Sequence, residues 1–177
     1  MKDSHKPRWH LDSPSDMNVA LNCVRMGYVA ISCPDITGVY KDLGSDSGEY
    51  NRKVRTVLRG MTGIKNSKEI LNVREFGLAS LQVWSHKIMR WATPWFMLAL
   101  IPVNIAIIDE GLIYQLAMLG QLLIYTTGLL GLAFPFLRKN TLIRTVFFFL
   151  QVNVATAHAF VKFTSGERMT TWKPSKR

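Results

Sequence analysis

Two groups of side chains in this sequence are of types that could do chemistry. Asp16 stands at the start of an expected helix and carries an ionisable carboxylate, a group that general acid–base chemistry uses. An aspartate before a helix is more often a plain N-cap, so a structural role stays open for Asp16. The second group is three arginines of an expected basic helix, Arg52, Arg55 and Arg59. A solvated or lipid-facing basic helix would also account for these arginines.

The cysteines give no sign of a metal site. Cys23 and Cys33 form neither a CxxC pair nor a disulfide framework, so we interpret them as free thiols. They indicate that the first half of the chain faces a reducing compartment. The sequence predicts no metal site.

The charges divide the 177 residues into two different halves. Residues 1–90 hold 14 of the 22 Lys and Arg and 9 of the 12 Asp and Glu, whereas residues 91–136 hold only Asp109 and Glu110. A soluble helix needs a charged face, which 91–136 cannot supply. The net charge of +10 could attract nucleic acid or anionic lipid. Because the basic residues cluster before and between the apolar segments, we expect membrane lipids as partners and no nucleic acid.

The elements that must position these residues begin with an apolar C-terminal half. It predicts a bundle of about three transmembrane helices over 91–163, with spans at 91–108, 112–136 and 145–163, followed by a basic tail at 164–177. Pro94 is expected near the entry of the first span, where the chain turns into the bilayer. Gly120, Gly128 and Gly131 should let the second span pack closely against a neighbour.

The orientation of these spans contains a conflict. Residues 1–90 are expected to face the cytoplasm, and three crossings would then place the tail outside. The tail carries Arg168, Lys173, Lys176 and Arg177, which disagrees. Either the charge rule is broken or one segment is re-entrant, and the short, proline-containing first span is the one expected to fail to cross.

Residues 67–90 lead into the first span. Their apolar residues recur at spacings of three and four, which predicts an amphipathic helix. We expect this helix to lie in the head-group plane, with a helix in a soluble core as the alternative. The interface residues would be Trp84, His86, Lys87, Arg90 and Trp91.

The first half contains too few elements for a domain of its own. We expect a helix over 15–28 with an apolar face formed by Val19, Ala20, Cys23 and Val24 and a C-cap at Gly27. A short buried strand, Tyr28–Cys33, and a basic helix, Tyr50–Ile64, should follow. One strand and two helices cannot close an independent core, so residues 1–66 are interpreted as the end of a larger α/β domain.

The order of these segments resembles the C-terminal part of a membrane-bound family 2 glycosyltransferase with a GT-A fold. The resemblance rests on Ser15-Asp16 before a helix that ends in Gly27-Tyr28, on the segment VAISCPDI, and on the basic run from Arg52 to Gly60. It continues in Ser85-His86-Lys87-Ile88-Met89-Arg90-Trp91 and in Thr171-Trp172-Lys173-Pro174. It covers roughly residues 12–177. The implied fold is mainly α: a small α/β remnant of a GT-A domain, an interfacial amphipathic helix and a transmembrane bundle.

The resemblance also implies roles for individual residues. Asp16 matches the family's general base, and Arg52, Arg55 and Arg59 would contact diphosphate or lipid-phosphate groups of the acceptor side. Ser15 replaces the first acid of the family's acidic pair. No tryptophan follows Arg55 or Arg59 as in processive members, so polymer synthesis is not expected.

The largest departure is the donor side of the fold. The nucleotide-sugar half, with its Asp-x-Asp metal motif, would need many more residues than the fifteen before Asp16. The chain alone is therefore expected to be inactive and to hold no cofactor, whereas a complete enzyme would use Mg or Mn. Whether the chain acts as an enzyme thus stays open.

Three hypotheses remain for its function. The first is the acceptor-side and anchor portion of an inner-membrane glycosyltransferase, which would transfer a sugar from a nucleotide-sugar to a membrane-associated acceptor. Its donor-binding half would lie on a separate partner chain or be lost. The second is a non-catalytic membrane interaction or scaffold protein, and the third is an unrelated membrane subunit.

Overall fold

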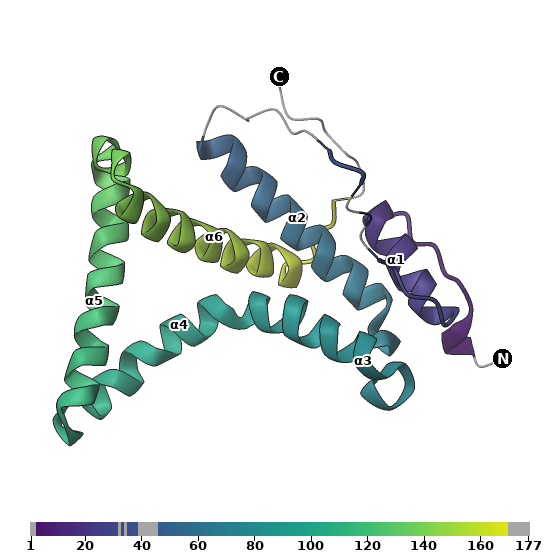
Figure 1. Ribbon diagram of the computed structural model, residues 1–177, viewed down its shortest axis with the longest axis horizontal. Helices are drawn as coiled ribbons and strands as arrows, with labels where there is room; N and C mark the ends of the chain where they lie inside the picture. Colours follow the sequence, from purple (N-terminus) through teal and green to yellow (C-terminus); the bar gives the residue numbers. More distant parts are fainter. Residues whose placement is uncertain (1–2, 32, 34, 39–45, 170–177) are drawn as a thin grey trace. The chain divides into compact units, whose positions relative to one another are not determined.

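The computed structural model describes residues 3–31, 33, 35–38 and 46–169, and in this part the chain is mainly helical, with no strand. Figure 1 shows the six α-helices: α1 Ser15–Arg25, α2 Asp46–Asn66, α3 Val73–Val83, α4 Met89–Ala106, α5 Leu112–Ala133 and α6 Thr141–Thr164. A π-helical turn, η3, spans Trp84–Ile88, and the 3-10 turns are η1 Asp3–His5, η2 Lys68–Leu71, η4 Ile108–Glu110 and η5 Pro135–Lys139. The chain forms two compact units. The first unit comprises Met1–Trp91 with His158–Arg177, and the second comprises Ala92–Ala157.

Three helical stretches are long and apolar enough to cross a membrane, as judged from length and composition. They are Val73–Ala106, Leu112–Ala133 and Thr141–Thr164. The expected apolar spans are thus confirmed as helices, although the first one continues a helical stretch that begins at Val73. Pro94 lies inside α4 rather than at its start. This arrangement is compatible with an integral membrane protein.

In the second unit, a polar cluster joins α4 to α5. The Asn104 side chain donates to Oε1 of Gln121 at 2.6 Å, and the Tyr125 hydroxyl donates to the Met97 carbonyl at 2.9 Å. Gln121 Nε2 lies 3.2 Å from the Tyr125 hydroxyl and 3.3 Å from the same carbonyl. Polar groups at membrane depth need such partners because lipid offers none. Asn104 and Gln121 thus form a hydrogen bond between α4 and α5.

Two glycines bring α5 and α6 together. A Cβ atom on Gly128 would overlap the Leu150 side chain, and one on Gly131 would lie 3.2 Å from the Phe147 Cβ. Arg138 closes this end of the pair, because its Nε donates to the Gly131 carbonyl and its guanidinium lies 4.0 Å from the Phe147 ring centroid. The prediction of close packing is confirmed at Gly128 and Gly131. It is wrong for Gly120, which no side chain approaches.

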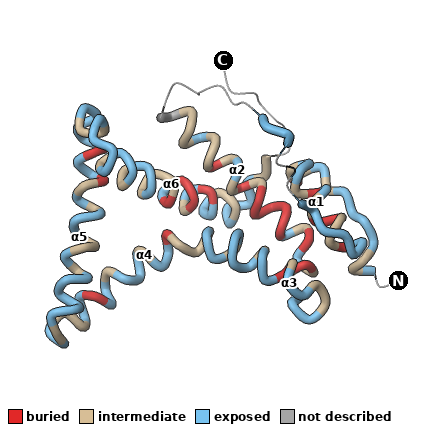
Figure 2. Tube along the Cα trace, viewed as in Figure 1, coloured by how far each residue is buried: buried red, intermediate tan, exposed pale blue. Residues whose placement is uncertain are grey.

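Helix α2 is the central element of the first unit. Its buried side chains Val54, Leu58, Met61 and Ile64 recur at spacings of three and four, which places them on one face. A Cβ on Gly60 would lie 3.0 Å from Cζ2 of Trp91, and one on Gly63 would lie 2.7 Å from the Met17 sulfur. Figure 2 shows buried positions on α2, α1 and α6, whereas α5 is exposed along most of its length.

The end of α6 also belongs to the first unit. The Tyr50 hydroxyl lies 3.0 Å from Nδ1 of His158, and the Lys65 ammonium lies 5.8 Å from the centroid of the Phe163 ring. Residues at both ends of α2 therefore contact the last turns of a helix that is apolar enough to cross a membrane.

Helix α1 ends as expected but buries the opposite face. Gly27, with φ +79°, accepts the left-handed conformation, while Gly27 N–H donates to the Val24 carbonyl and Tyr28 N–H to the Cys23 carbonyl. The buried side chains are Asn18, Leu21, Asn22 and Arg25, and Val19 is half exposed. The prediction that α1 packs through Val19, Ala20, Cys23 and Val24 is therefore wrong. The polar residues of the opposite face are buried instead, because they form hydrogen bonds inside the unit.

The expected strand at Tyr28–Cys33 is also absent from the described part of that segment. Tyr28–Ile31 and Cys33 are exposed and form no ladder. A strand needs a paired neighbour for its backbone groups, and the described residues offer none. The α/β character expected for residues 1–66 is therefore not found among them.

Replacing Asn104 with leucine should destabilise the helical hairpin α4–α5. The change removes the 2.6 Å bond to Gln121 and should cost about 0.6–1.7 kcal/mol, the range for hydrogen bonds between membrane helices. Unfolding of the chain in micelles, followed by circular dichroism, measures the loss. Gln115→Leu is the matched control because Gln115 is exposed on α5. Equal stabilities of the two variants would contradict a structural role for the cluster.

Candidate functional site

Asp16 is the second residue of α1 and is exposed to solvent. The N-cap position is Pro14, and no side chain caps the helix, so the N-cap interpretation of Asp16 is wrong. The carboxylate makes no hydrogen bond or ion pair with the described residues. Its charge lies in the first turn, where the helix dipole favours an anion. The side chain is therefore free to meet an external group.

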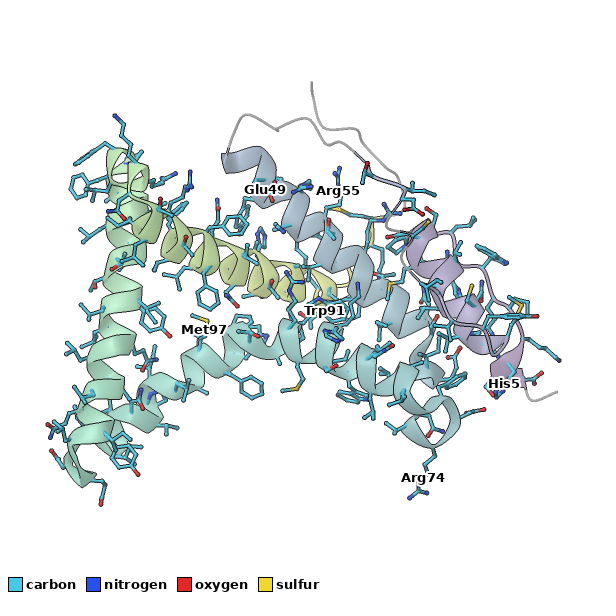
Figure 3. The ribbon with its side chains drawn as sticks, in the orientation of Figure 1. His5, Glu49, Arg55, Arg74, Trp91 and Met97 are labelled. Carbon is cyan, nitrogen blue, oxygen red and sulfur yellow. The ribbon has the colours of Figure 1, made fainter. Side chains whose placement is uncertain are left out.

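The three arginines lie on α2 at spacings of three and four, which places them on one side of the helix. Arg52 is held by Glu49, with contacts of 2.8 and 3.1 Å to the two carboxylate oxygens. Arg55 and Arg59 are half buried, and the Nε of Arg59 is buried without a hydrogen-bond partner among the described residues. Figure 3 shows Glu49 and Arg55 along α2. An unsatisfied guanidinium N–H suits an oxygen-rich anion.

The packing of α1 brings the start of that helix against the arginine-bearing helix. Met17, the neighbour of Asp16, contacts the backbone at Gly63, which lies one helical turn beyond Arg59. The side chain of Asn66, at the end of α2, donates to Oδ1 of Asp12 at 2.8 Å. The carboxylate and the arginines thus belong to two helices that pack directly on each other.

A buried polar network fixes α1 in this position. Arg25 is only 1% exposed, and its guanidinium donates to Glu69 Oε1 at 2.6 Å, to Ser67 Oγ at 2.7 Å and to Asn22 Oδ1 at 2.7 Å. Asn22 exchanges two hydrogen bonds with the backbone of Arg8, and Asn18 donates to the His10 carbonyl. The network joins α1, η2 and the N-terminal segment, so it positions the helix that carries Asp16.

The charge state of Glu69 depends on this network. Burial alone raises the pKa of Glu69, but the hydrogen bond from Arg25, a backbone hydrogen bond and the charges of Arg25 and Arg8 outweigh burial and lower the pKa below its usual value near 4.5. Glu69 is therefore ionised at neutral pH and neutralises the buried Arg25.

This network was not predicted from the sequence. Its signal was present, because Asn18, Asn22 and Arg25 recur at helical spacing, and a polar stripe of this kind can be buried when its partners are supplied. The partners Ser67 and Glu69 lie more than forty residues away in the chain, which no local pattern reveals.

The predicted interface residues occupy η3 and its flanks. Trp84, His86, Lys87 and Arg90 are exposed, whereas Trp91 is half buried beside Gly60. The Trp84 indole N–H donates to the Leu71 carbonyl at 3.1 Å, which ties η3 to η2. Gly77, with φ +52°, interrupts α3 between these two points.

Within the described residues, no group of three His, Cys, Asp or Glu side chains lies close enough to hold a metal ion. The sequence matches no protein-family model, and neither the curated proteins nor the solved structures yield a match.

The Arg25–Glu69 pair predicts an acid-sensitive first unit. Because the folded pKa of Glu69 is lowered, the pair stabilises the fold fully above the usual pKa near 4.5 and loses this contribution as pH falls through the folded pKa. Glu69→Gln should cost about 1.5–3 kcal/mol at pH 7 and flatten the acid side of the stability profile. Hydrogen exchange of α1 amides across pH measures both effects. Glu110→Gln, the same substitution at an exposed glutamate of η4, should leave the dependence of stability on pH unchanged. If stability falls with acid in the same way in Glu69→Gln as in the parent chain, the Arg25–Glu69 pair is not the source of the acid sensitivity.

Proposed function

We propose that this chain is the acceptor-side and membrane-anchor portion of a family 2 glycosyltransferase. In this proposal it works with a donor-binding half to transfer a sugar from a nucleotide-sugar to a membrane-associated acceptor. The chain alone is inactive because the nucleotide and its Mg or Mn ion bind to the other half. That half is the expected protein partner.

The observation that carries the proposal is the uncovered apolar surface before α2. Large apolar side chains are exposed here outside the helices that could cross a membrane, and Val29 and Ile31 are 81% and 85% exposed. Among the described residues before α2, the exposed large apolar side chains are Trp9, Leu11, Val19, Met26, Tyr28, Val29, Ile31 and Ile36. Water-facing apolar residues in such number favour a further protein layer over them. A donor-binding α/β half would supply that layer.

The arrangement of α1 and α2 supports the acceptor-side role. Asp16 has an unengaged carboxylate, as a general base for an acceptor hydroxyl requires. It lies on a helix packed against α2, where Arg59 has an unsatisfied Nε and Arg52 and Arg55 lie on the same side. Arginines on a helix that packs against the one carrying a base suit an acceptor that carries phosphate, such as a lipid-linked sugar.

The helices of the C-terminal half support the anchor role. We place residues 1–90 on the cytoplasmic side of the inner membrane, with α3 and η3 as the amphipathic segment at the surface. The contact between Tyr50 and His158 favours the same side for the end of α6. That placement agrees with the basic character of Arg168 and requires an even number of crossings.

The test is a two-chain assay in membranes. The chain is co-expressed with a donor-binding half of a family 2 glycosyltransferase that has an Asp-x-Asp motif, and transfer of labelled sugar to membrane lipid is measured. The pair should transfer sugar, and Asp16→Asn should reduce the rate by about 10²–10⁴-fold because the base is lost. Asp3→Asn, at an exposed aspartate paired with Lys6, should leave the rate unchanged.

The outcomes separate the hypotheses. Full transfer by the Asp16→Asn pair would remove Asp16 from the chemistry but keep the anchor role. Absence of transfer with every donor half tested, while the chain inserts and folds, would favour the non-catalytic interaction or scaffold protein.

A further inference from the structure

The end of α6 carries an arrangement of charges that the proposed glycosyltransferase role does not use. The Lys65 ammonium and the Arg168 guanidinium both lie against the ring of Phe163, at 5.8 Å and 4.5 Å from its centroid. These distances allow cation–π attraction to each cation. Two cations on one ring also repel each other, so the cluster of Lys65, Phe163 and Arg168 gains stability when an anion joins it.

The backbone places Arg168 on the ring. Gly166 has φ +88°, a conformation that glycine adopts without strain, and it follows the last turn of α6. Its N–H donates to the Phe163 carbonyl, and Glu167 N–H donates to the Lys162 carbonyl, which is the pattern of a Schellman cap. The chain thereby reverses, and one Arg168 nitrogen donates to the Phe163 carbonyl at 2.9 Å. The guanidinium is fixed in place and keeps further N–H groups for a ligand.

No carboxylate among the described residues neutralises the cluster. The nearest acid in sequence, Glu167, is paired with Lys162 at 3.0 Å. Lys65 is exposed at the last turn of α2, and Arg168 is half buried. Two positioned cations without a carboxylate leave a site for an external anion.

The location indicates the kind of anion. Phe163 is the second-last residue of α6, a helix apolar enough to cross a membrane, so the cluster lies where such a helix leaves the hydrocarbon core. Phosphates of lipid head groups lie at this depth, and basic side chains are attracted to those with net negative charge. Arginine and lysine are the residues that bind phosphate oxygens best.

We propose that Lys65, Phe163 and Arg168 form a binding site for a phosphate group, supplied by an anionic phospholipid at the end of α6. The site joins α2 to α6, so an occupied site holds the first unit at the membrane surface. This role is independent of any sugar transfer.

The experiment uses the full chain in phosphatidylcholine vesicles that contain spin-labelled phosphatidylglycerol or spin-labelled phosphatidylcholine. The relative association constant of the anionic lipid over the zwitterionic lipid is the readout. The parent chain should prefer phosphatidylglycerol, and Lys65→Gln and Arg168→Gln should each reduce this preference by up to about fivefold. Phe163→Leu should also reduce it although it changes no charge, because leucine cannot gather the two cations.

The control is Lys6→Gln, which removes one exposed positive charge of the same unit outside residues 67–90, the segment placed in the head-group plane. An equal loss of preference in this control, or an unchanged preference in Lys65→Gln with Arg168→Gln, overturns the proposal. Circular dichroism confirms that each variant is folded. Added inorganic phosphate distinguishes the source: no displacement of the lipid assigns the site to the head group, and displacement at millimolar phosphate overturns that assignment in favour of a soluble phosphate.

Discussion

The close approach of neighbouring helices to α2 is the constraint on which the first unit depends. Gly60 and Gly63 remove the side chains that would otherwise hold Trp91 and Met17 away from the α2 backbone. Through these two positions α2 contacts the start of α4 and the start of α1, and through Tyr50 and Lys65 it contacts the end of α6. Helix α2 thus contacts α1, the start of α4 and the end of α6. The proposed acceptor-side role and the proposed phosphate site both depend on residues that α2 brings together.

Burial of polar groups gives the first unit its unusual surface. Helix α1 buries Asn22 and Arg25 because Ser67 and Glu69 complete their hydrogen bonds, and a satisfied buried network of this kind specifies one packing arrangement. In the same packing arrangement, Val19 faces outward and Tyr28–Ile31 are exposed. The first unit therefore buries a polar network beside the apolar face of α2 and exposes apolar side chains before α2. In the second unit, exposed leucines suit lipid.

Composition and local pattern were enough to predict the apolar helices, the basic helix α2, the glycine cap of α1 and the close packing at Gly128 and Gly131. These features depend on residues near one another in the chain. The sequence failed where distant partners decide the outcome. The buried face of α1 depends on residues of η2, and the expected strand at Tyr28–Cys33 depends on neighbours that the described residues do not include. The N-cap interpretation of Asp16 was wrong by two residues, because the helix begins at Ser15 and Pro14 is its N-cap. The contact of α6 with α2 joins residues more than a hundred positions apart, which no local pattern predicts.

The end of α6 packs on α2, and we propose that it therefore lies on the same side of the membrane as the first half of the chain. Cross-linking of cysteines at positions 50 and 158 by a short bismaleimide in native membranes tests this placement most directly, with Cys23 and Cys33 replaced by serine. The Tyr50 hydroxyl and Nδ1 of His158 meet at the tips of their side chains, 3.0 Å apart, so the reagent has to span the gap that the shorter cysteine side chains leave. We predict rapid cross-linking in Tyr50→Cys with His158→Cys and none in either single variant. Failure of the double variant to cross-link, together with labelling of the two cysteines from opposite sides of the membrane, would contradict the account.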